Sequence, residues 1–87
     1  MNNNFNNLSD DELHKLIGSN VAKIRQEKGY SQLSLSLEMG NNSPSLLSSA
    51  ELYKDKRHFN ITQLHKIAKI LDVEICDFFC YNYDQEG

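Results

Sequence analysis

The chain has 87 residues, which allow one domain with a small core and leave no room for the deep cleft that most metabolic enzymes need. Apolar residues make up 39% and charged residues 24%, as in a globular protein, and no apolar run approaches the roughly 20 residues of a transmembrane helix. The net charge of −3 argues against a uniformly basic surface, so any basic patch has to be local.

Residues 1–8 are rich in Asn and are predicted to form a disordered lead-in. A first helix then begins at Ser9, which together with Glu12 has the pattern of a capping box, and ends at Gly29. Gly18 lies inside this helix and is expected to bend or divide it, because glycine is a poor helix former. The predicted core stripe, at helical spacing, consists of Leu13, Ile17, Val21 and Ile24.

Two short helices are predicted next, over residues 32–39 and 44–53, with a turn of Gly40, Asn41 and Asn42 between them. Ser31 is the expected cap of the first helix. For the second, Ser43 is the expected cap and Pro44 the first helical residue, where a missing N–H costs nothing.

After a polar, basic connection over residues 54–58, Asn60 is expected to cap a fourth helix, whose buried stripe consists of Leu64, Ile67, Ala68 and Leu71. A short fifth helix over residues 74–80 is expected to direct Ile75, Phe78 and Phe79 toward the core. No segment alternates as a strand does, so the sequence predicts an all-α domain of five helices.

The charge is distributed unevenly along the sequence. Residues 13–71 contain all nine Lys and Arg and four Asp and Glu, a local charge of +5, whereas the flanks contain eight acids and no Lys or Arg. A polyanion interacts with the charge within about one Debye length, roughly 8–10 Å, so this segment suits a nucleic acid. A solvated helical domain with acidic ends explains the same charges equally well.

Residues 32–39 and 44–53 have the arrangement of a helix-turn-helix with Gly in its turn. The elements Arg25-x3-Gly29-x-Ser31-Gln32 and Ile67-Ala68-x2-Leu71-x-Val73, with this spacing, resemble the Cro/repressor (XRE-type) DNA-binding domain over roughly residues 13–79. The resemblance implies a compact, lambda-repressor-like five-helix domain over residues 9–80, followed by a short tail over residues 81–87.

The resemblance also implies which residues contact DNA. In that family the second helix of the motif lies in the major groove and the preceding helix crosses the backbone. The implied base-contacting positions, none of which has a long bidentate side chain, are Pro44, Ser45, Leu46, Ser48 and Ser49. The implied phosphate-contacting positions are Gln32, Lys54, Lys56, Arg57 and His58.

Residues 50–53, near the end of the recognition helix, have expected structural roles. Glu51 occupies the position that pairs with Arg25 in the family, and the resemblance implies a structural ion pair between the two. Ala50 stands where a large aliphatic residue is usual, and Leu52 or Tyr53 is expected to fill the space beside it.

No pattern indicates an enzyme, because there is no phosphate-binding glycine loop, no nucleophile elbow and no close pair of carboxylates with a pocket around it. The histidines are dispersed. Cys76 and Cys80 are four residues apart and could form half a metal site, but we expect them to be small apolar residues of a short helix. We therefore expect no metal and no cofactor. The chain also lacks a secretory signal and a disulfide framework, which predicts a cytoplasmic protein.

The sequence favours a sequence-specific DNA-binding transcription regulator of the operator-binding repressor or controller type, associated with the nucleoid. A homodimer is expected, because one helix-turn-helix buries too little surface to bind a site tightly. The alternative is an antitoxin or other protein-binding module, which neutralises a toxin partner and autoregulates its operon. The aromatic tail from Cys80 to Tyr83 either borders a dimer interface or packs against the core.

Overall fold

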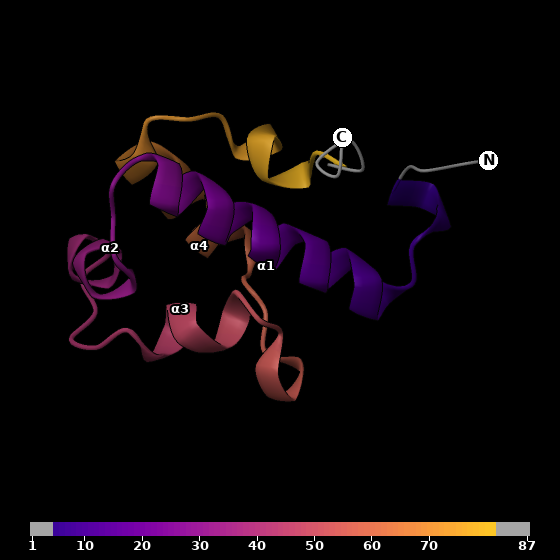
Figure 1. The fold of residues 1–87 in the computed structure, drawn as a ribbon, viewed down its shortest axis with the longest axis horizontal. Helices are drawn as coiled ribbons and strands as arrows, with labels where there is room; N and C mark the ends of the chain where they lie inside the picture. Colours follow the sequence, from indigo (N-terminus) through magenta and orange to yellow (C-terminus); the bar gives the residue numbers. More distant parts are fainter. Residues whose placement is uncertain (1–4, 82–87) are drawn as a thin grey trace.

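The computed structural model describes residues 5–81 and contains, in this range, helices and turns but no strand (Figure 1). The α-helices are α1 (Asp10–Glu27), α2 (Gln32–Glu38), α3 (Ser45–Ala50) and α4 (Ile61–Leu71), and the 3-10 helices are η1 (Phe5–Asn7), η2 (Lys54–Lys56) and η3 (Ile75–Phe79). The all-α prediction is confirmed. The predicted fifth helix is the 3-10 helix η3, and residues 5–7 of the predicted lead-in form η1, while residues 1–4 lie outside the described range.

Capping boxes begin three of the α-helices. The Ser9 hydroxyl accepts from the Glu12 N–H at 3.1 Å, and the Glu12 carboxylate accepts from the Ser9 N–H at 2.9 Å. Ser31 and Asn60 start α2 and α4 in the same way. Because these boxes satisfy N–H groups that the helix leaves free, they fix where each helix begins, as predicted.

The start and end of α3 differ from the prediction. Pro44, rather than Ser43, is the N-cap residue, and no side chain caps the helix. The Ser43 hydroxyl lies 2.8 Å from the Ser45 hydroxyl and accepts a long hydrogen bond, 3.4 Å, from the Ser45 N–H. At its other end α3 stops at Ala50 and not at Tyr53, because Tyr53 adopts a left-handed conformation with φ +57° that an α-helix cannot contain.

The core contains side chains from all four α-helices and from η3. Its fully buried large residues include Val21, Leu35, Leu47, Ile67, Leu71 and Phe78. The predicted α4 stripe is buried as expected, whereas Leu13 and Ile24 of the α1 stripe are only half-buried. Ile75 and Phe79 pack against the core from η3 and are also half-buried.

η3 packs along α1, and Asn20 connects the two (Figure 1). The Asn20 side-chain amide is buried and donates to the carbonyls of Phe78 and Cys80 at 2.9 and 2.8 Å. The beginning of the tail is therefore attached to the domain. The rest of the predicted tail, residues 82–87, lies outside the described residues.

Gly18 neither bends nor divides α1, which is continuous. A Cβ atom at this position would lie 2.5 Å from the Ala50 carbonyl oxygen and 2.8 Å from that of Glu51. Gly18 thus allows the backbones of α1 and the end of α3 to meet directly. Leu52 does not fill the space beside Ala50, because the residue is 75% exposed.

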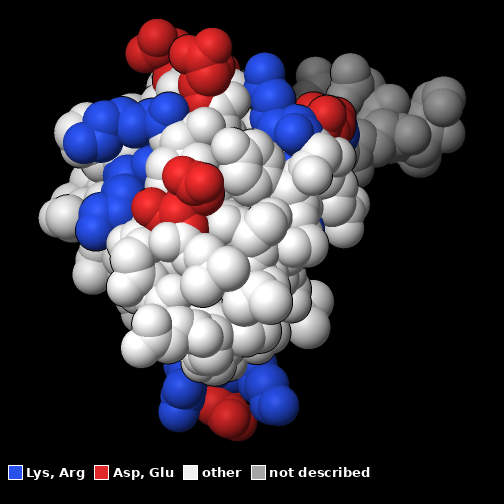
Figure 2. Space-filling view, turned by 90° about the vertical axis from the view of Figure 1, so that its left-hand side faces the viewer, with Lys and Arg blue, Asp and Glu red and all other residues white. Residues whose placement is uncertain are grey.

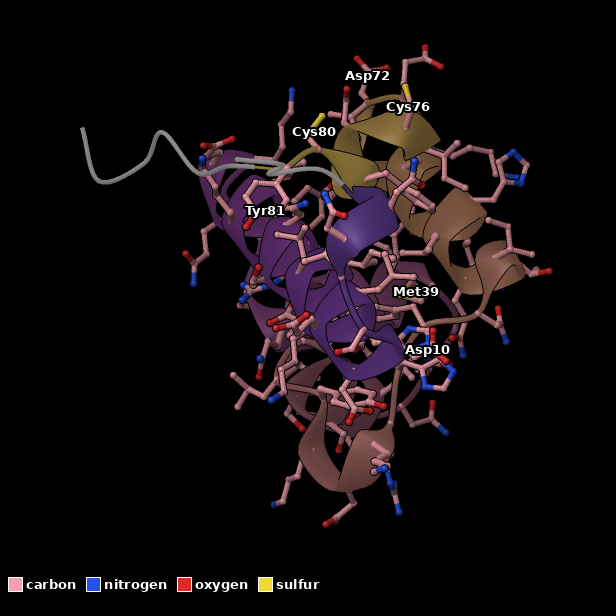
Figure 3. All side chains as sticks on the ribbon, turned by 90° about the vertical axis from the view of Figure 1, so that its right-hand side faces the viewer. Asp10, Met39, Asp72, Cys76, Cys80 and Tyr81 are labelled. Atoms are coloured by element: carbon pink, nitrogen blue, oxygen red, sulfur yellow. The ribbon has the colours of Figure 1, made fainter. Side chains whose placement is uncertain are left out.

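Cys76 and Cys80 are both exposed, which differs from the expected apolar packing. Figure 3 shows them at the outer edge of the molecule, on the side of η3 that faces away from the core. None of the helices over residues 5–81 has the length and hydropathy that a bilayer crossing requires.

Candidate nucleic-acid interface

α2, residues 39–44 and α3 form the helix-turn-helix. Gly40 adopts a φ of +92°, a left-handed conformation that glycine takes without strain. The N–H groups of Gly40 and Asn41 donate to the Leu37 and Ser36 carbonyls at 3.0 and 2.9 Å and so close the end of α2. Local hydrogen bonds therefore fix the direction in which the chain leaves α2.

The outer face of α3 forms a ridge between two shallow hollows. Ser45 and Leu46 line both of them. The hollow on the turn side also includes residues 40–43 and Gln63, and the hollow on the other side includes Ser49 and Arg57. The first residues of α3 therefore stand between the two hollows.

The side chains on this ridge are short. Ser45 is exposed, and the other four predicted base-contacting residues are half-buried: Pro44, Leu46, Ser48 and Ser49. The Ser48 hydroxyl donates to the Ser45 carbonyl at 3.1 Å, which leaves its oxygen free only as an acceptor. Leu47 and Ala50 point into the core and hold the ridge against the domain.

Arg25 holds the end of α3 to α1. Its Nε donates to Glu51 Oε2 at 2.7 Å, its Nη2 donates to Glu51 Oε1 at 3.1 Å, and both residues are buried. The remaining Nη1 donates to the Tyr30 carbonyl at 2.7 Å. This is the ion pair that the resemblance implies, and its bidentate geometry fixes how α3 sits on the domain.

Gln32 belongs to the same network. Its side-chain amide donates one hydrogen bond to Glu51 Oε1 at 3.0 Å. This contact orients Glu51 and leaves the second N–H of the amide for the predicted phosphate contact.

The chain reverses direction immediately after α3, over residues 53–58. Tyr53, Asp55 and Lys56 all have φ between 53° and 63°, in the left-handed region, which costs of order 1–3 kcal/mol for each non-glycine residue. Lys54, Lys56 and Arg57 are exposed here, so three cations lie beside the C-terminal end of the ridge. We call residues 53–58 the basic turn.

Aromatic rings attach the basic turn to α1. The rings of His14 and His58 stack with centroids 3.8 Å apart, and the Tyr53 ring lies beside this pair, 5.7 Å from His14 and 6.2 Å from His58. The Tyr53 hydroxyl donates to Asp11 Oδ1 at 2.7 Å. His58, a predicted phosphate-contacting residue, therefore packs against α1, and its Nδ1 lies 3.0 Å from the Lys56 carbonyl oxygen.

These contacts shift the pKa of three groups. Burial, followed by the nearby charge of His58, lowers the pKa of His14 below its usual 6.5. The Tyr53 hydrogen bond, followed by the charge of Lys56, lowers the pKa of Asp11, and the same hydrogen bond raises the pKa of Tyr53. The sequence carried no local signal for this cluster, because Asp11 and His14 lie far along the sequence from Tyr53 and His58 and meet them only in the folded chain.

The charged side chains around the ridge lie at the two ends of this face. Figure 2 shows a broad uncharged area between side chains of both signs in its upper part and a group at its lower end, blue with red between, where the basic turn lies. Lys56 Nζ is 4.0 Å from Asp11 Oδ1. Within residues 5–81, the side chains of Lys54 and Arg57 form no hydrogen bond and no ion pair. Over the same residues, no three His, Cys, Asp or Glu side chains gather as a metal site.

Comparisons with known proteins agree with this geometry. A family model described as Helix-turn-helix matches residues 21–78. The fold is similar to that in the crystal structure of the DNA-binding domain of BldD, with a TM-score of 0.70 and 19% sequence identity over 83% of this chain and 100% of that one. No curated protein matches the sequence. Since the family model spans most of the chain and the fold agrees, the chain belongs to the XRE-type helix-turn-helix family of DNA-binding domains.

Proposed function

We propose that this protein is a transcription regulator that recognises a specific operator and acts by occupying it. The observation that carries the proposal is the α3 ridge, whose outer face the described chain leaves accessible, with the basic turn at one end. In this arrangement the ridge enters the major groove while the cations of the turn reach the phosphates on its border.

The proposal gives separate roles to the ridge and to the turn. The hydroxyls of Ser45 and Ser49 donate to or accept from base edges, and the Leu46 methyl groups contact a thymine methyl. Lys54 and Lys56 contact phosphates. Within the protein, Gln32 orients Glu51 and His58 holds the basic turn against α1.

We further propose that two copies bind together. A single six-residue recognition helix with short side chains provides few base contacts. Two copies related by a two-fold axis would double these contacts and would bind half-sites about 34 Å apart on one face of the duplex.

The test is an anisotropy titration of the full chain with duplex DNA from its own promoter region and with a random-sequence duplex, each at several salt concentrations. We expect tighter binding to the promoter duplex, and a log K that falls linearly with log salt with a slope of about −0.9 per phosphate contact. Lys54→Ala should weaken binding to both duplexes by the same factor. It should also make the salt slope less steep by about 0.9, the contribution of one phosphate contact.

Lys69→Ala is the matched control, because Lys69 lines a hollow with Asp72 and Glu74, away from the ridge. It should leave both affinities close to the wild-type values. A flat salt response, or equal affinity for the two duplexes, would contradict the proposal. A protein-binding module such as an antitoxin would then be the better explanation.

A further inference from the structure

The residues on the ridge leave the specificity of this protein unexplained. All of them are Ser, Leu or Pro, and a serine hydroxyl can donate to or accept from any base. Sharp discrimination comes from planar side chains that make two hydrogen bonds to one base edge, such as Arg on guanine. No side chain of that kind lies on α3 itself.

Arg57 lies beside the ridge although it belongs to a different segment. It lines the same hollow as Ser45, Leu46 and Ser49, which are on the outer face of α3. The hollow thus combines an aliphatic side chain, two hydroxyls and a guanidinium.

The chain path explains how Arg57 reaches this place. The left-handed residues of the basic turn bring the chain back along α3, and the Arg57 N–H donates to the Lys54 carbonyl at 3.0 Å. The next two residues are fixed: the His58 ring stacks on His14, and Phe59 is buried in the core. The backbone of Arg57 is therefore held at a defined distance from the ridge.

The guanidinium is available for a ligand. Within the described residues no carboxylate pairs with it, whereas Lys56 of the same turn lies 4.0 Å from Asp11 at the start of α1. An unpaired guanidinium has five donors in a rigid fork, which match the O6 and N7 acceptors of guanine.

We propose that Arg57 is a specificity-determining residue of this interface and contacts a guanine edge in the major groove next to α3. This inference rests on the proposed function and revises the phosphate contact that the sequence implies for Arg57. Lys54 and Lys56 remain the phosphate contacts. The base preference would then come from the turn and not mainly from the recognition helix.

The experiment begins with a duplex selected by the wild-type full chain from a random-sequence DNA library. Arg57→Ala and Arg57→Lys are each titrated against this duplex and against a scrambled duplex. We expect both variants to lose about 5- to 150-fold in the ratio of specific to scrambled affinity, the range that one bidentate base contact provides. Arg57→Lys retains the charge, so its affinity for the scrambled duplex should stay close to wild type.

A modified base locates the contact. Replacing the contacted guanine by 7-deazaguanine removes the N7 acceptor, so it should weaken wild-type binding and have no further effect on Arg57→Ala. Lys54→Ala is the control: it should lower both affinities equally and keep the sensitivity to 7-deazaguanine. Circular dichroism checks that each variant is folded, which we expect because Arg57 is exposed.

The outcomes separate the two proposals. If the wild-type protein selects no duplex at all, the proposed function is overturned. Two results would overturn only this inference and make Arg57 a phosphate contact. In the first, the protein selects a duplex, but Arg57→Ala lowers the specific and scrambled affinities to the same extent, as Lys54→Ala does. In the second, 7-deazaguanine weakens binding by Arg57→Ala at every guanine as it weakens binding by the wild type.

Discussion

At the scale of single residues, the buried charge pair determines the position of α3. Glu51 accepts two hydrogen bonds from Arg25 and one from Gln32, so its carboxylate is satisfied although only 4% of the residue is exposed. A buried ion pair of this kind adds little net stability, but removing one partner strands the other charge and costs about 3–5 kcal/mol. The pair therefore specifies where the recognition helix sits more than it stabilises the domain.

We expect that Ser36 makes the domain less stable than an alanine at the same position would. It is fully buried, and its hydroxyl finds no hydrogen-bond partner among the described residues. We predict that Ser36→Ala raises the free energy of unfolding by about 1 kcal/mol, because it removes an unsatisfied buried group and favours the helix. Urea denaturation measures the change.

Ser34→Ala is the control for this substitution, in the same helix. The Ser34 hydroxyl accepts from the Ser31 N–H at 2.9 Å as part of the capping box, so its loss should lower stability. A Ser36→Ala variant that is less stable than wild type would show that the hydroxyl is satisfied.

The role of a residue could be predicted from the sequence only where the residue belongs to a local motif. The positions of Arg25 and Glu51 belong to a recognisable spacing, so their pairing could be inferred. The roles of Asn20 and Ser36 could not, because Asn20 binds carbonyls 58 and 60 residues away and the environment of Ser36 exists only once the helices pack.

At the scale of elements, the close crossing of α1 over the end of α3 depends on Gly18. A methyl group there would lie 2.5 Å from the Ala50 carbonyl oxygen, a backbone atom that cannot move without shifting α3. We predict that Gly18→Ala destabilises the domain by about 1–3 kcal/mol, although Ala is ordinarily the better helix former. The measurement is the urea midpoint with its slope.

Ser19→Ala tests the same exchange to alanine one residue along α1. Ser19 is exposed, and its hydroxyl donates only to the Leu16 carbonyl of the same helix. This variant should be as stable as wild type or slightly more stable. If Gly18→Ala behaved in the same way, α1 and α3 would not be in backbone contact.

Element boundaries were predictable where a side chain fixes them. The capping boxes at Ser9 and Asn60 are encoded within four residues, and both helices begin as expected. The end of α3 was not predictable, because Leu52 and Tyr53 have no helix-ending signal. The left-handed conformation at Tyr53 is stabilised by contacts with Asp11 and His14, which lie at the start of α1 and are distant only in sequence.

At the scale of the whole molecule, the stacked histidines make stability depend on pH. The pKa of His14 is lowered by burial and by His58, so the unfolded chain binds the proton first as the pH falls. The contribution of His14 to stability should therefore be complete above pH 6.5 and should decrease as the pH falls below it. The pKa of Asp11 is also lowered, so the unfolded chain takes up this proton at a higher pH than the folded chain does. A second loss of stability should therefore follow around and below pH 3.8.

Thermal unfolding between pH 8 and pH 5 measures the first of these losses. His14→Phe keeps a ring against His58 and cannot titrate, so its melting temperature should vary less over this interval than that of wild type. An unchanged slope in His14→Phe would show that His14 does not cause the pH dependence.

The location of the interface was more predictable than its details. The uneven charge and the motif spacing indicated both the helix-turn-helix and the basic residues after it, since both are consecutive in sequence. The placement of Arg57 beside Ser45 and Ser49 depends on the left-handed turn, for which residues 53–56 contain no Gly or Asn as a signal.

The acids of residues 72–77 lie at the opposite end of the molecule from the basic turn, as the label of Asp72 shows (Figure 3). A chain with a negative total can in this way keep these acids away from the surface that carries Lys54 and Arg57. When the basic turn approaches a duplex, the acids of residues 72–77 would then point away from the phosphates and repel them less. A larger share of diffusive encounters would then be productive, and dissolved salt would remove this advantage long before it disrupted the fold.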